Sequence, residues 1–254
     1  MNIIINDFNI YYEKIGSGKE NIIILPGWGN TRPTFNLMID ALKKYYNVYI
    51  LDYPGFGNSS FPNRNLTIYD YAELIQNFIN ILDIKDPIVI THSFGTRIAL
   101  ILNAKLKIKF KKLIIIDGAG IKKKKCILLK SKQFLYKLLK KLSIIFPKKF
   151  KKLYLKKLVN IFGSADYKSL NDNMKKTFSN IVSEDLSYLL KNISSETLLI
   201  WGEKDCDTPL KDGIKMNNSI VDSGLIIIKN GTHFSYLDVP FYVNNIIIEF
   251  VHFQ

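Results

Sequence analysis

The chain has 254 residues, which is enough for one large domain or for one domain that carries an insertion. Hydrophobic residues make up 47% and charged residues 23% of the sequence, and these ordinary globular values exclude a disordered or fibrous protein. The 36 Lys and Arg residues against 22 Asp and Glu residues give a formal net charge of +14. The longest apolar runs are far shorter than the ~20 residues that span a bilayer.

The first 118 residues alternate between two hydrophobic patterns. Short β-branched runs predict buried strands, and apolar residues at three- and four-residue steps predict helices. In chain order we predict a strand over 9–15, a strand over 22–25, a helix over 34–42, a strand over 47–51, a helix from the N-cap Thr67 to Leu82, a strand over 88–91, a helix over 94–106 and a strand over 113–117.

Residues 119–194 contain no strand-like run, and their periodicity is helical throughout. We predict helices over 127–146, 147–162, 166–182 and 183–193, with Pro147 beginning the second helix and Gly163 ending it. A helical insertion between two strands of a parallel sheet lies over the carboxyl edge of that sheet, where α/β folds bind their ligands. The segment is therefore interpreted as a cap.

The alternation resumes after this segment, with a strand over 198–201, a helix over 210–216, a strand over 225–228 and a helix over 239–250. Continuous apolar strands separated by helices indicate a mostly parallel sheet with helices on both faces. The predicted fold class is α/β, with a core made of residues 1–118 and 195–254 and a helical, lysine-rich cap made of residues 119–194.

The positive charge is concentrated in one part of the chain. Residues 119–180 hold 18 lysines against Asp166 and Asp172, a local balance of +16, whereas the rest of the chain has 18 basic and 20 acidic residues. Such asymmetry suggests two parts with different tasks. No zinc-finger, recognition-helix or RNA-binding signature accompanies the lysines, so we expect no nucleic-acid partner.

The two cysteines, Cys126 and Cys206, lack the spacing of a metal site, and no other cluster in the sequence indicates a metal or a cofactor. Residues 1–7 have neither the basic region nor the small-residue cleavage site of a signal peptide. We therefore expect a cytoplasmic protein in a reducing compartment, with no cofactor.

The strand over 88–91 leads into a helix through His92-Ser93-Phe94-Gly95. A serine on so tight a strand-to-helix turn projects its hydroxyl above the sheet, near the N-terminus of the helix. This stretch resembles the nucleophile elbow G-x-S-x-G of the α/β-hydrolase superfamily, although Thr91 stands where the first glycine belongs. Taken alone, the match is equally compatible with a structural turn.

A serine nucleophile needs a base, and the base needs an acid that fixes its tautomer. The superfamily order is Ser, then Asp or Glu, then His. Trp201-Gly202-Glu203-Lys204-Asp205, followed by Pro209, is similar to the family's acid stretch, and Asn230-Gly231-Thr232-His233-Phe234 is similar to its histidine loop. The resemblance implies a triad of Ser93, Asp205 and His233. Asp207 and Asp117, which ends a strand, compete with Asp205 for the role of the acid, and His92 is expected to point back into the protein.

The resemblance also implies an oxyanion hole made of two backbone N–H groups, those of Phe94 and Trp28, the latter in the loop Leu25-Pro26-Gly27-Trp28-Gly29-Asn30. The Trp28 side chain can serve as a packing aromatic at the same time. Trp28, Phe94, Arg97 and Phe234 are the residues that we expect to contact the substrate. The stretch from Asp52 to Ser59 matches the family's D-x-x-G-x-G-x-S loop, which is more often structural than catalytic.

Three hypotheses of function follow from these residues. The first is a serine carboxylic-ester hydrolase, similar to the compact capped esterases with a Gly-Trp-Gly loop, the pimeloyl-carrier-protein methyl ester esterases among them. The second is a lyase that uses the same triad, similar to a synthase of the menaquinone pathway, with Arg97 holding a carboxylate. The third is a catalytically silent binding protein on the same scaffold. A serine nucleophile disfavours the dehalogenases and epoxide hydrolases of the superfamily, which need Asp.

Two explanations give the lysine-rich cap no binding role: a codon bias toward Lys, and the solubility that exposed lysines provide. The functional alternative is attraction of an acidic partner, such as an anionic membrane surface, a carboxylated substrate or an acidic acyl carrier protein. A carrier protein fits the esterase hypothesis, because its acyl chain could pass under the cap to Ser93. The substrate itself is expected to be a small-molecule ester.

Overall fold

The computed structural model describes residues 1–122, 138, 139, 141, 147, 150, 151, 154, 157, 158, 170 and 172–252. The helices predicted over 127–146 and 147–162 fall mostly outside the described residues, as does the first part of the helix predicted over 166–182. The division into a core and a cap therefore stays a prediction. No helix among the described residues is long and apolar enough to cross a membrane.

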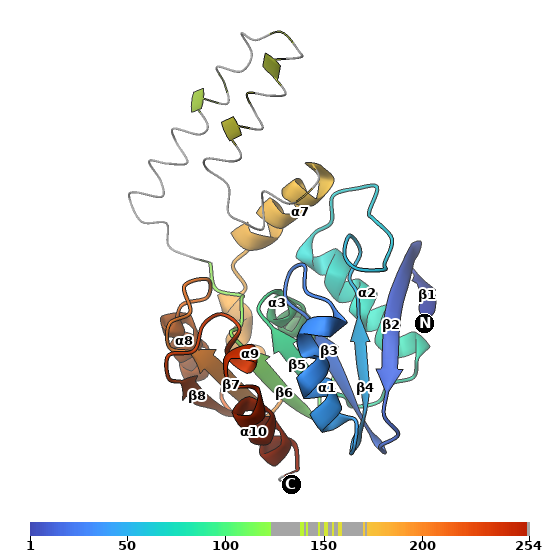
Figure 1. Ribbon diagram of the computed structural model, residues 1–254, viewed down its shortest axis with the longest axis vertical. Coiled ribbons are helices and arrows are strands. Elements are labelled where there is room, and N and C mark those ends of the chain that lie inside the picture. Colours follow the sequence, from blue (N-terminus) through green and yellow to red (C-terminus); the bar gives the residue numbers. More distant parts are fainter. Residues whose placement is uncertain are drawn as a thin grey trace.

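An eight-stranded sheet forms the centre of the molecule, in the order β1-β2-β4-β3-β5-β6-β7-β8 (Figure 1). The pairs β1–β2 and β2–β4 are antiparallel, and every other pair is parallel. The strands are β1 (Asn2–Ile5), β2 (Phe8–Ile15), β3 (Glu20–Leu25), β4 (Tyr46–Leu51), β5 (Ile88–His92), β6 (Lys112–Ile116), β7 (Thr197–Gly202) and β8 (Ser223–Ile228). The prediction of a mostly parallel α/β sheet is confirmed.

Strand β1 was not predicted, and a tight hairpin explains how it forms. Ile5 pairs with Phe8, which leaves Asn6 and Asp7 as the two turn residues, with φ values of 48° and 65°. Asn and Asp tolerate this left-handed conformation, and two such residues in a row match the right-handed twist of the flanking strands. The short run Ile3-Ile4-Ile5 thereby gains a partner in β2 at the edge of the sheet.

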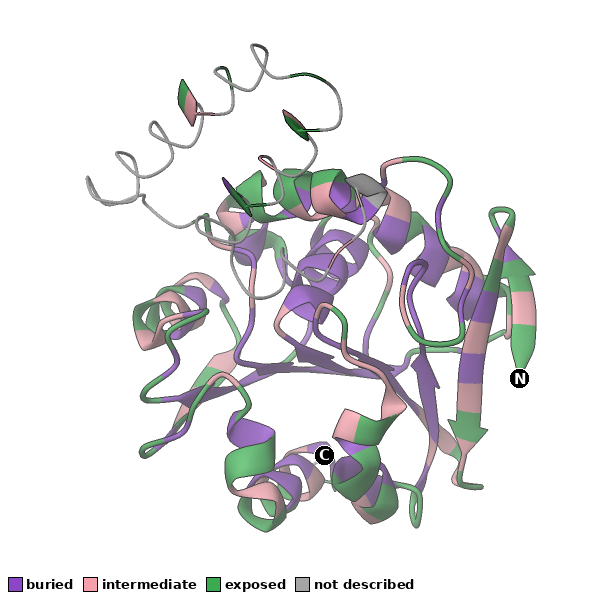
Figure 2. Cartoon of the chain, turned by 45° about the horizontal axis from the view of Figure 1, so that its top comes forward, coloured by how far each residue is buried: buried purple, intermediate pink, exposed green. Residues whose placement is uncertain are grey.

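Helices cover both faces of the sheet, and alternate strand residues divide between two cores. On one face, Ile22 and Ile24 pack with α1 (Asn36–Leu42), the short α9 (Ser235–Asp238) and α10 (Pro240–His252). On the other face, Ile23 and Leu25 pack with α2 (Ile68–Ile81), α3 (Phe94–Leu100) and α8 (Leu210–Ser219). Figure 2 shows the buried sheet between these two layers.

Several local signals set where the helices begin and continue. Thr67 caps α2, because its side chain accepts a hydrogen bond from the Asp70 N–H while the Asp70 carboxylate accepts one from the Thr67 N–H. Helix α3 is shorter than predicted, since the chain continues from Ile101 to Lys105 as a wider π-helical turn. Inside that turn the buried Asn103 donates to the Ile108 carbonyl and to the Ser195 hydroxyl.

The chain returns to the core through α7 (Asp172–Ser183) and a 3₁₀ helix, η4 (Ser187–Asn192). The helix predicted over 183–193 is therefore wrong in kind and in its start. The Asp185 carboxylate accepts hydrogen bonds from the backbone N–H groups of Ser187 and Lys122, and the Leu186 N–H donates to the Gly120 carbonyl. These bonds join the return segment to the segment that leaves β6, and they break the α-helical pattern.

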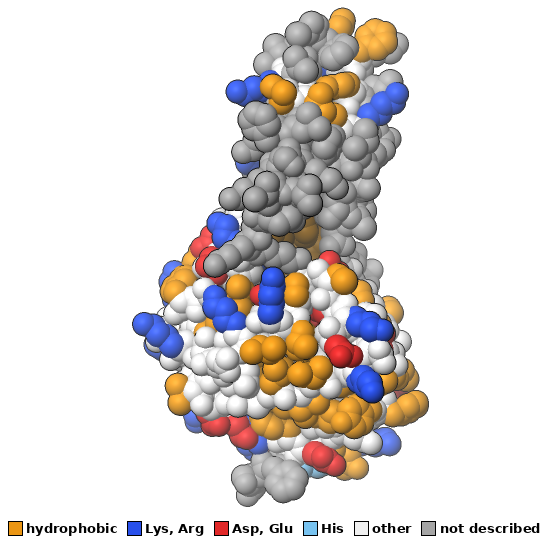
Figure 3. Space-filling model, turned by 90° about the vertical axis from the view of Figure 1, so that its left-hand side faces the viewer, with side chains coloured by type: hydrophobic (Ala, Val, Ile, Leu, Met, Phe, Trp, Pro, Cys, Tyr) orange, Lys and Arg blue, Asp and Glu red, His pale blue; other side chains and the backbone are white. Residues whose placement is uncertain are grey.

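Strand β8 forms the second edge of the sheet. Figure 3 looks at this side of the molecule and shows hydrophobic side chains gathered there, with basic and acidic side chains scattered around them. Val221 and Ile227 are among the exposed hydrophobic residues. The described core surface on this side is thus mixed in charge rather than strongly basic.

Candidate active site

The serine predicted as nucleophile lies on a strained turn between β5 and α3. Ser93 has φ 47° and ψ −111°, a conformation that non-glycine residues adopt rarely and at a cost of about 1–3 kcal/mol. The Ser93 N–H donates to the Ile116 carbonyl, which fixes the turn to β6. At Gly95 an added Cβ would lie 2.0 Å from the Leu25 carbonyl oxygen, so only glycine lets α3 start this close to β3. The predicted strand–turn–helix context is present.

Thr91, which departs from the glycine of the elbow pattern, has a defined place in the packing. Its side chain is fully buried, and its hydroxyl lies 2.9 Å from the Thr96 hydroxyl and 3.2 Å from the Ile114 carbonyl oxygen. A buried hydroxyl is tolerated when its hydrogen bonds are made. Threonine at this position therefore keeps the turn intact while linking β5 to α3 and β6.

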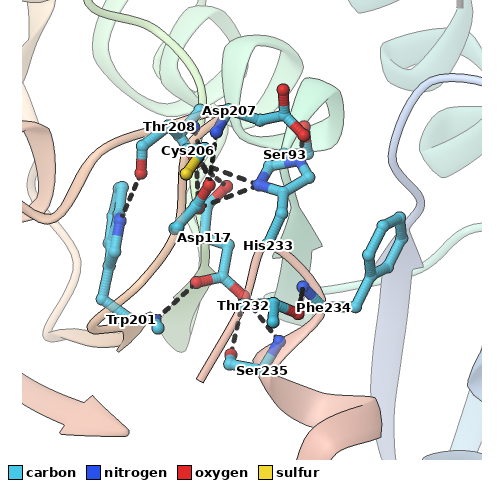
Figure 4. Close-up of polar contacts among 12 residues, drawn as sticks. Ser93, Asp117, Trp201, Cys206, Asp207, Thr208, Thr232, His233, Phe234 and Ser235 are labelled. Carbon is cyan, nitrogen blue, oxygen red and sulfur yellow. Dashed lines mark hydrogen bonds and ion pairs between the residues drawn. The ribbon is translucent and has the colours of Figure 1, made fainter. Parts of the chain in front are cut away.

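Three residues from separate loops at the carboxyl edge of the sheet form one hydrogen-bonded chain, of which Figure 4 labels Ser93 and His233. His233 Nε2 lies 2.9 Å from Ser93 Oγ, and His233 Nδ1 lies 2.9 Å from Asp205 Oδ2. Asp205 follows β7, and His233 follows β8. The structure thus brings together the three residues that the sequence predicted as nucleophile, base and acid.

The Asp205 carboxylate is completely buried and well supplied with donors. Besides His233, it accepts hydrogen bonds from the backbone N–H groups of Asp207 and Thr208 and from the Thr208 hydroxyl, at 2.7–2.9 Å. Burial alone would raise the pKa of Asp205, but the hydrogen bonds from His233 and Thr208 outweigh it and lower the pKa. The acid is therefore ionised at neutral pH.

His233 experiences opposing influences from its surroundings. Burial lowers the pKa of its imidazole, whereas the hydrogen bond to Asp205 and the negative charges of Asp205, Asp207 and Asp117 raise it. The net pKa is raised above the ordinary value of 6.5. A histidine with this balance can accept a proton from a neighbouring hydroxyl near neutral pH and hold it next to a carboxylate.

The two competing acids have other positions. The Asp207 side chain is exposed, and its backbone N–H donates to Asp205. Asp117 is buried and accepts hydrogen bonds from the Gly202 N–H and from the N–H and hydroxyl of Ser235. Burial raises the pKa of Asp117 to about 6 despite these bonds. Asp117 ties β6 to β7 and to the start of α9, while His233 itself bonds to Asp205.

The loop after β3 packs against the nucleophile turn. At Gly27 an added Cβ would lie 2.6 Å from His92 Nδ1, so this glycine permits the close approach. Among the described residues, the backbone N–H groups of Trp28 and Phe94 donate to no protein acceptor. Both groups are therefore open to an oxyanion, as the prediction requires. The Trp28 ring also packs, with its centroid 4.8–5.2 Å from those of Phe56, Phe94 and, in α7, Phe178.

The other two predicted substrate-contacting residues differ in position. Phe234 is 37% exposed, and its ring centroid lies 5.5 Å from that of His233. Arg97 is buried, and its guanidinium donates to the Glu184 carbonyl oxygen at 2.9 Å, in the segment that follows α7. Burial lowers the pKa of Arg97 to about 10. Arg97 is not part of the hydrogen-bonded set around Ser93.

Sequence reasoning missed Thr208, whose hydroxyl lies 2.7 Å from Asp205 Oδ2, 2.9 Å from the Asp117 carbonyl oxygen and 3.2 Å from His233 Nδ1. Its position just before Pro209 in the acid loop was the available signal. The loop from Asp52 to Ser59 closes on itself, since Asp52 accepts from the Asn58 N–H and the Ser59 hydroxyl donates to the Asp52 carbonyl. Within the described part of the chain, no cluster of His, Cys, Asp or Glu is arranged to hold a metal ion.

The fold and the site define an α/β-hydrolase. Residues 20–170 match the family described as alpha/beta hydrolase fold, and the chain belongs to that family. The prediction of an enzyme of this superfamily is confirmed, since its relatives are named esterases and hydrolases.

Among these relatives is the pimeloyl-[acyl-carrier protein] methyl ester esterase of Wigglesworthia glossinidia brevipalpis, which is 30% identical over 95% of this chain and 97% of its own length. A 2-hydroxy-6-oxononadienedioate/2-hydroxy-6-oxononatrienedioate hydrolase of Pseudomonas putida is 24% identical over 96% of this chain and 92% of its own. The solved esterase of Exiguobacterium antarcticum superposes with a TM-score of 0.75 at 23% identity, covering 99% of this chain and 98% of its own. That structural likeness supports the fold.

Proposed function

We propose that the protein is a serine hydrolase that cleaves a carboxylic ester through an acyl-enzyme intermediate. The observation that carries this proposal is the continuous hydrogen-bonded chain from Ser93 Oγ through His233 to Asp205, with both distances at 2.9 Å. The strained backbone of Ser93 supports the same role, because such conformations persist mainly at functional sites.

Each residue of the site has its own role in the proposed reaction. Ser93 Oγ attacks the ester carbonyl carbon while His233 Nε2 accepts its proton, and Asp205 stabilises the imidazolium that forms. The N–H groups of Trp28 and Phe94 donate to the oxyanion of the tetrahedral intermediate. His233 then returns the proton to the leaving alcohol. A water molecule gives a proton to His233 and attacks the acyl carbon. His233 then returns that proton to Ser93 Oγ as the bond between the serine oxygen and the acyl carbon breaks, which releases the carboxylic acid and restores the serine.

The proposed substrate is an ester with an apolar acyl chain that is linked to an acidic carrier. Trp28, Phe94 and Phe178 form an aromatic cluster beside the nucleophile, and Phe234 lies next to the base. The relative from Wigglesworthia is named for an ester on an acyl-carrier protein. The +16 balance of residues 119–180 would attract such a carrier.

The second candidate is the lyase in which Arg97 holds a carboxylate. Its buried guanidinium already donates to the Glu184 carbonyl, and while burial lowers its pKa, the negative charges of Asp185 and Glu184 act to raise it. The ester hydrolase is therefore the better supported reaction, and the lyase becomes an outcome of the test.

The test combines p-nitrophenyl esters of increasing acyl length with a fluorophosphonate probe. Ester turnover together with covalent labelling supports the hydrolase, labelling without turnover of any ester supports the lyase, and the absence of both supports a silent binding protein. The Ser93→Ala variant is the matched control, because it removes one hydroxyl and should abolish both signals. Ester turnover that survives in this variant would contradict the proposal.

A further inference from the structure

His92 is a buried histidine beside the proposed triad, and the mechanism above does not use it. It is the last residue of β5, its side chain is completely buried, and it is joined to Ser93 by a peptide bond. Its Nε2 lies 2.8 Å from the carbonyl oxygen of His233, and its Nδ1 lies 3.4 Å from the Asn30 side-chain nitrogen. The ring thus contacts both the loop of the base and the loop that holds Trp28.

The chemistry of these two partners fixes the protonation state of the His92 ring. A carbonyl oxygen only accepts, so Nε2 must carry the hydrogen, and an amide nitrogen only donates, so Nδ1 must be the acceptor. One neutral tautomer satisfies both contacts. Burial lowers the pKa of His92 to about 3, helped by the neighbouring His233, although the bond to the His233 carbonyl and the charge of Asp205 act the other way. Tyr236, 5.0 Å away between centroids, has its pKa raised to about 12 by burial and is neutral too.

We propose that His92 is a positioning residue that holds the backbone of His233 at a fixed place relative to Ser93. This inference rests on the proposed function. Two consecutive residues contact the same histidine. Ser93 Oγ lies at hydrogen-bond distance from the His233 imidazole, and the His92 side chain lies at hydrogen-bond distance from the His233 carbonyl oxygen. A two-point attachment restricts both the translation and the rotation of the base. A misplacement of about 1 Å in a reacting group can cost ~100-fold in rate.

Two further hydrogen bonds hold the loop of the base independently of His92. Two residues beyond His233, the Ser235 N–H and hydroxyl both donate to the buried Asp117. Gly27 packs directly on the His92 ring, so Gln and Phe, which come close to its volume, are the main variants, and Asn is a smaller polar comparison. Variants of similar size are therefore expected to fold, and their defects should report on the His92–His233 bond.

The first experiment compares three substitutions at His92. Gln places an N–H near the position of Nε2, Asn places a polar group near Nδ1 alone, and Phe keeps the ring volume without either bond. We expect His92→Phe and His92→Asn to slow labelling by the fluorophosphonate probe and kcat for a p-nitrophenyl ester by ~10- to 100-fold, with KM nearly unchanged. His92→Gln should stay within about fivefold of the wild type. A Gln variant as slow as Phe, or three variants at the wild-type rate, would overturn the proposal.

The second experiment needs no variant to be active. Long-range ¹H–¹⁵N NMR of the wild-type chain reports the tautomer and charge of each of its three histidines. We expect His92 to remain neutral with hydrogen on Nε2 between pH 5.5 and 8, whereas His233 titrates. A His92 that titrates in this range, or that carries its hydrogen on Nδ1, contradicts the inference. Failure of the proposed function would appear instead as a wild-type chain that neither labels nor hydrolyses esters, with this NMR result unaffected.

Discussion

The loops at the carboxyl edge of the sheet and the lysine-rich segment 119–180 differ in how their sequences relate to function. In the loops, His233 must lie 2.9 Å from both Ser93 Oγ and Asp205 Oδ2, and Asp205 has specific donors around it. In the segment, the distinguishing feature is the summed charge of +16, whereas the rest of the chain is close to neutral. A single substitution at one of these three residues should therefore cost orders of magnitude in rate, whereas the segment should respond to total charge and to salt.

The largest effect is expected at the nucleophile. Ser93→Ala should lower kcat for a p-nitrophenyl ester by about 10⁴-fold or more, because triad residues act as a unit. Ser219→Ala is the matched control, since that hydroxyl donates to the Lys215 carbonyl of its own helix and has no other partner among the described residues. Similar rates in the two variants would remove Ser93 from the role of the nucleophile.

The next largest effect distinguishes two acids in the same loop. Asp205→Asn should reduce kcat by ~10⁴-fold, because the amide favours the wrong imidazole tautomer, as in serine-protease triads. Asp207→Asn should stay within a few-fold, since the Asp207 side chain is exposed and the hydrogen bond to Asp205 comes from the Asp207 backbone N–H. Steady-state kinetics of both variants check this. The reverse ranking would assign the acid to Asp207.

A smaller effect concerns pH. His233 must be neutral to accept the serine proton, so kcat/KM should fall as the pH drops through the pKa of His233, which the Asp205 hydrogen bond raises above 6.5 against the opposing effect of burial. The midpoint of this acid limb is thus expected above pH 6.5 in the wild type. In Asp205→Asn, which loses the negative charge, the limb should shift to lower pH. A pH–rate profile whose midpoint stays in place would remove Asp205 from the proposed role.

The smallest effect concerns the lysine-rich segment. Changing Lys122–Lys125 to Ser should lower kcat/KM for a carrier-linked ester by a few-fold at low salt and leave a neutral short ester unaffected, since salt screens such steering over a Debye length of about 10 Å at 0.1 M.

The charge-matched control changes four exposed lysines of the core, Lys19, Lys44, Lys211 and Lys229, to Ser. Equal losses in the two quadruple variants, or equal salt responses for the two substrates, would leave the segment with a solubilising role. In that case the variants at Ser93 and Asp205 would still test the proposed triad.

Sequence alone was sufficient for the parts of the molecule that repeat a simple pattern. The apolar runs of β3 to β8 and the N-cap Thr67 predicted most elements of the fold, and the order of Ser93, Asp205 and His233 predicted which side chains meet. The hairpin at Asn6-Asp7 and the 3₁₀ helix after Asp185 were not predicted, because a few turn conformations and side-chain hydrogen bonds determine their structure. The bonds of His92 to the His233 carbonyl and of Thr208 to the Asp117 carbonyl were not predicted, because they join residues distant in the chain and lie outside the motifs that identified the triad.

The central claim is that Ser93 is the nucleophile that forms a covalent intermediate, and the most direct test is to locate the adduct. The wild-type chain would be treated with a fluorophosphonate probe, digested and mapped by peptide mass spectrometry, with Asp205→Asn as a slow-reacting comparison. The account predicts one adduct, on Ser93, formed much more slowly in Asp205→Asn. An adduct on another residue, or none on the folded wild-type chain, would contradict it.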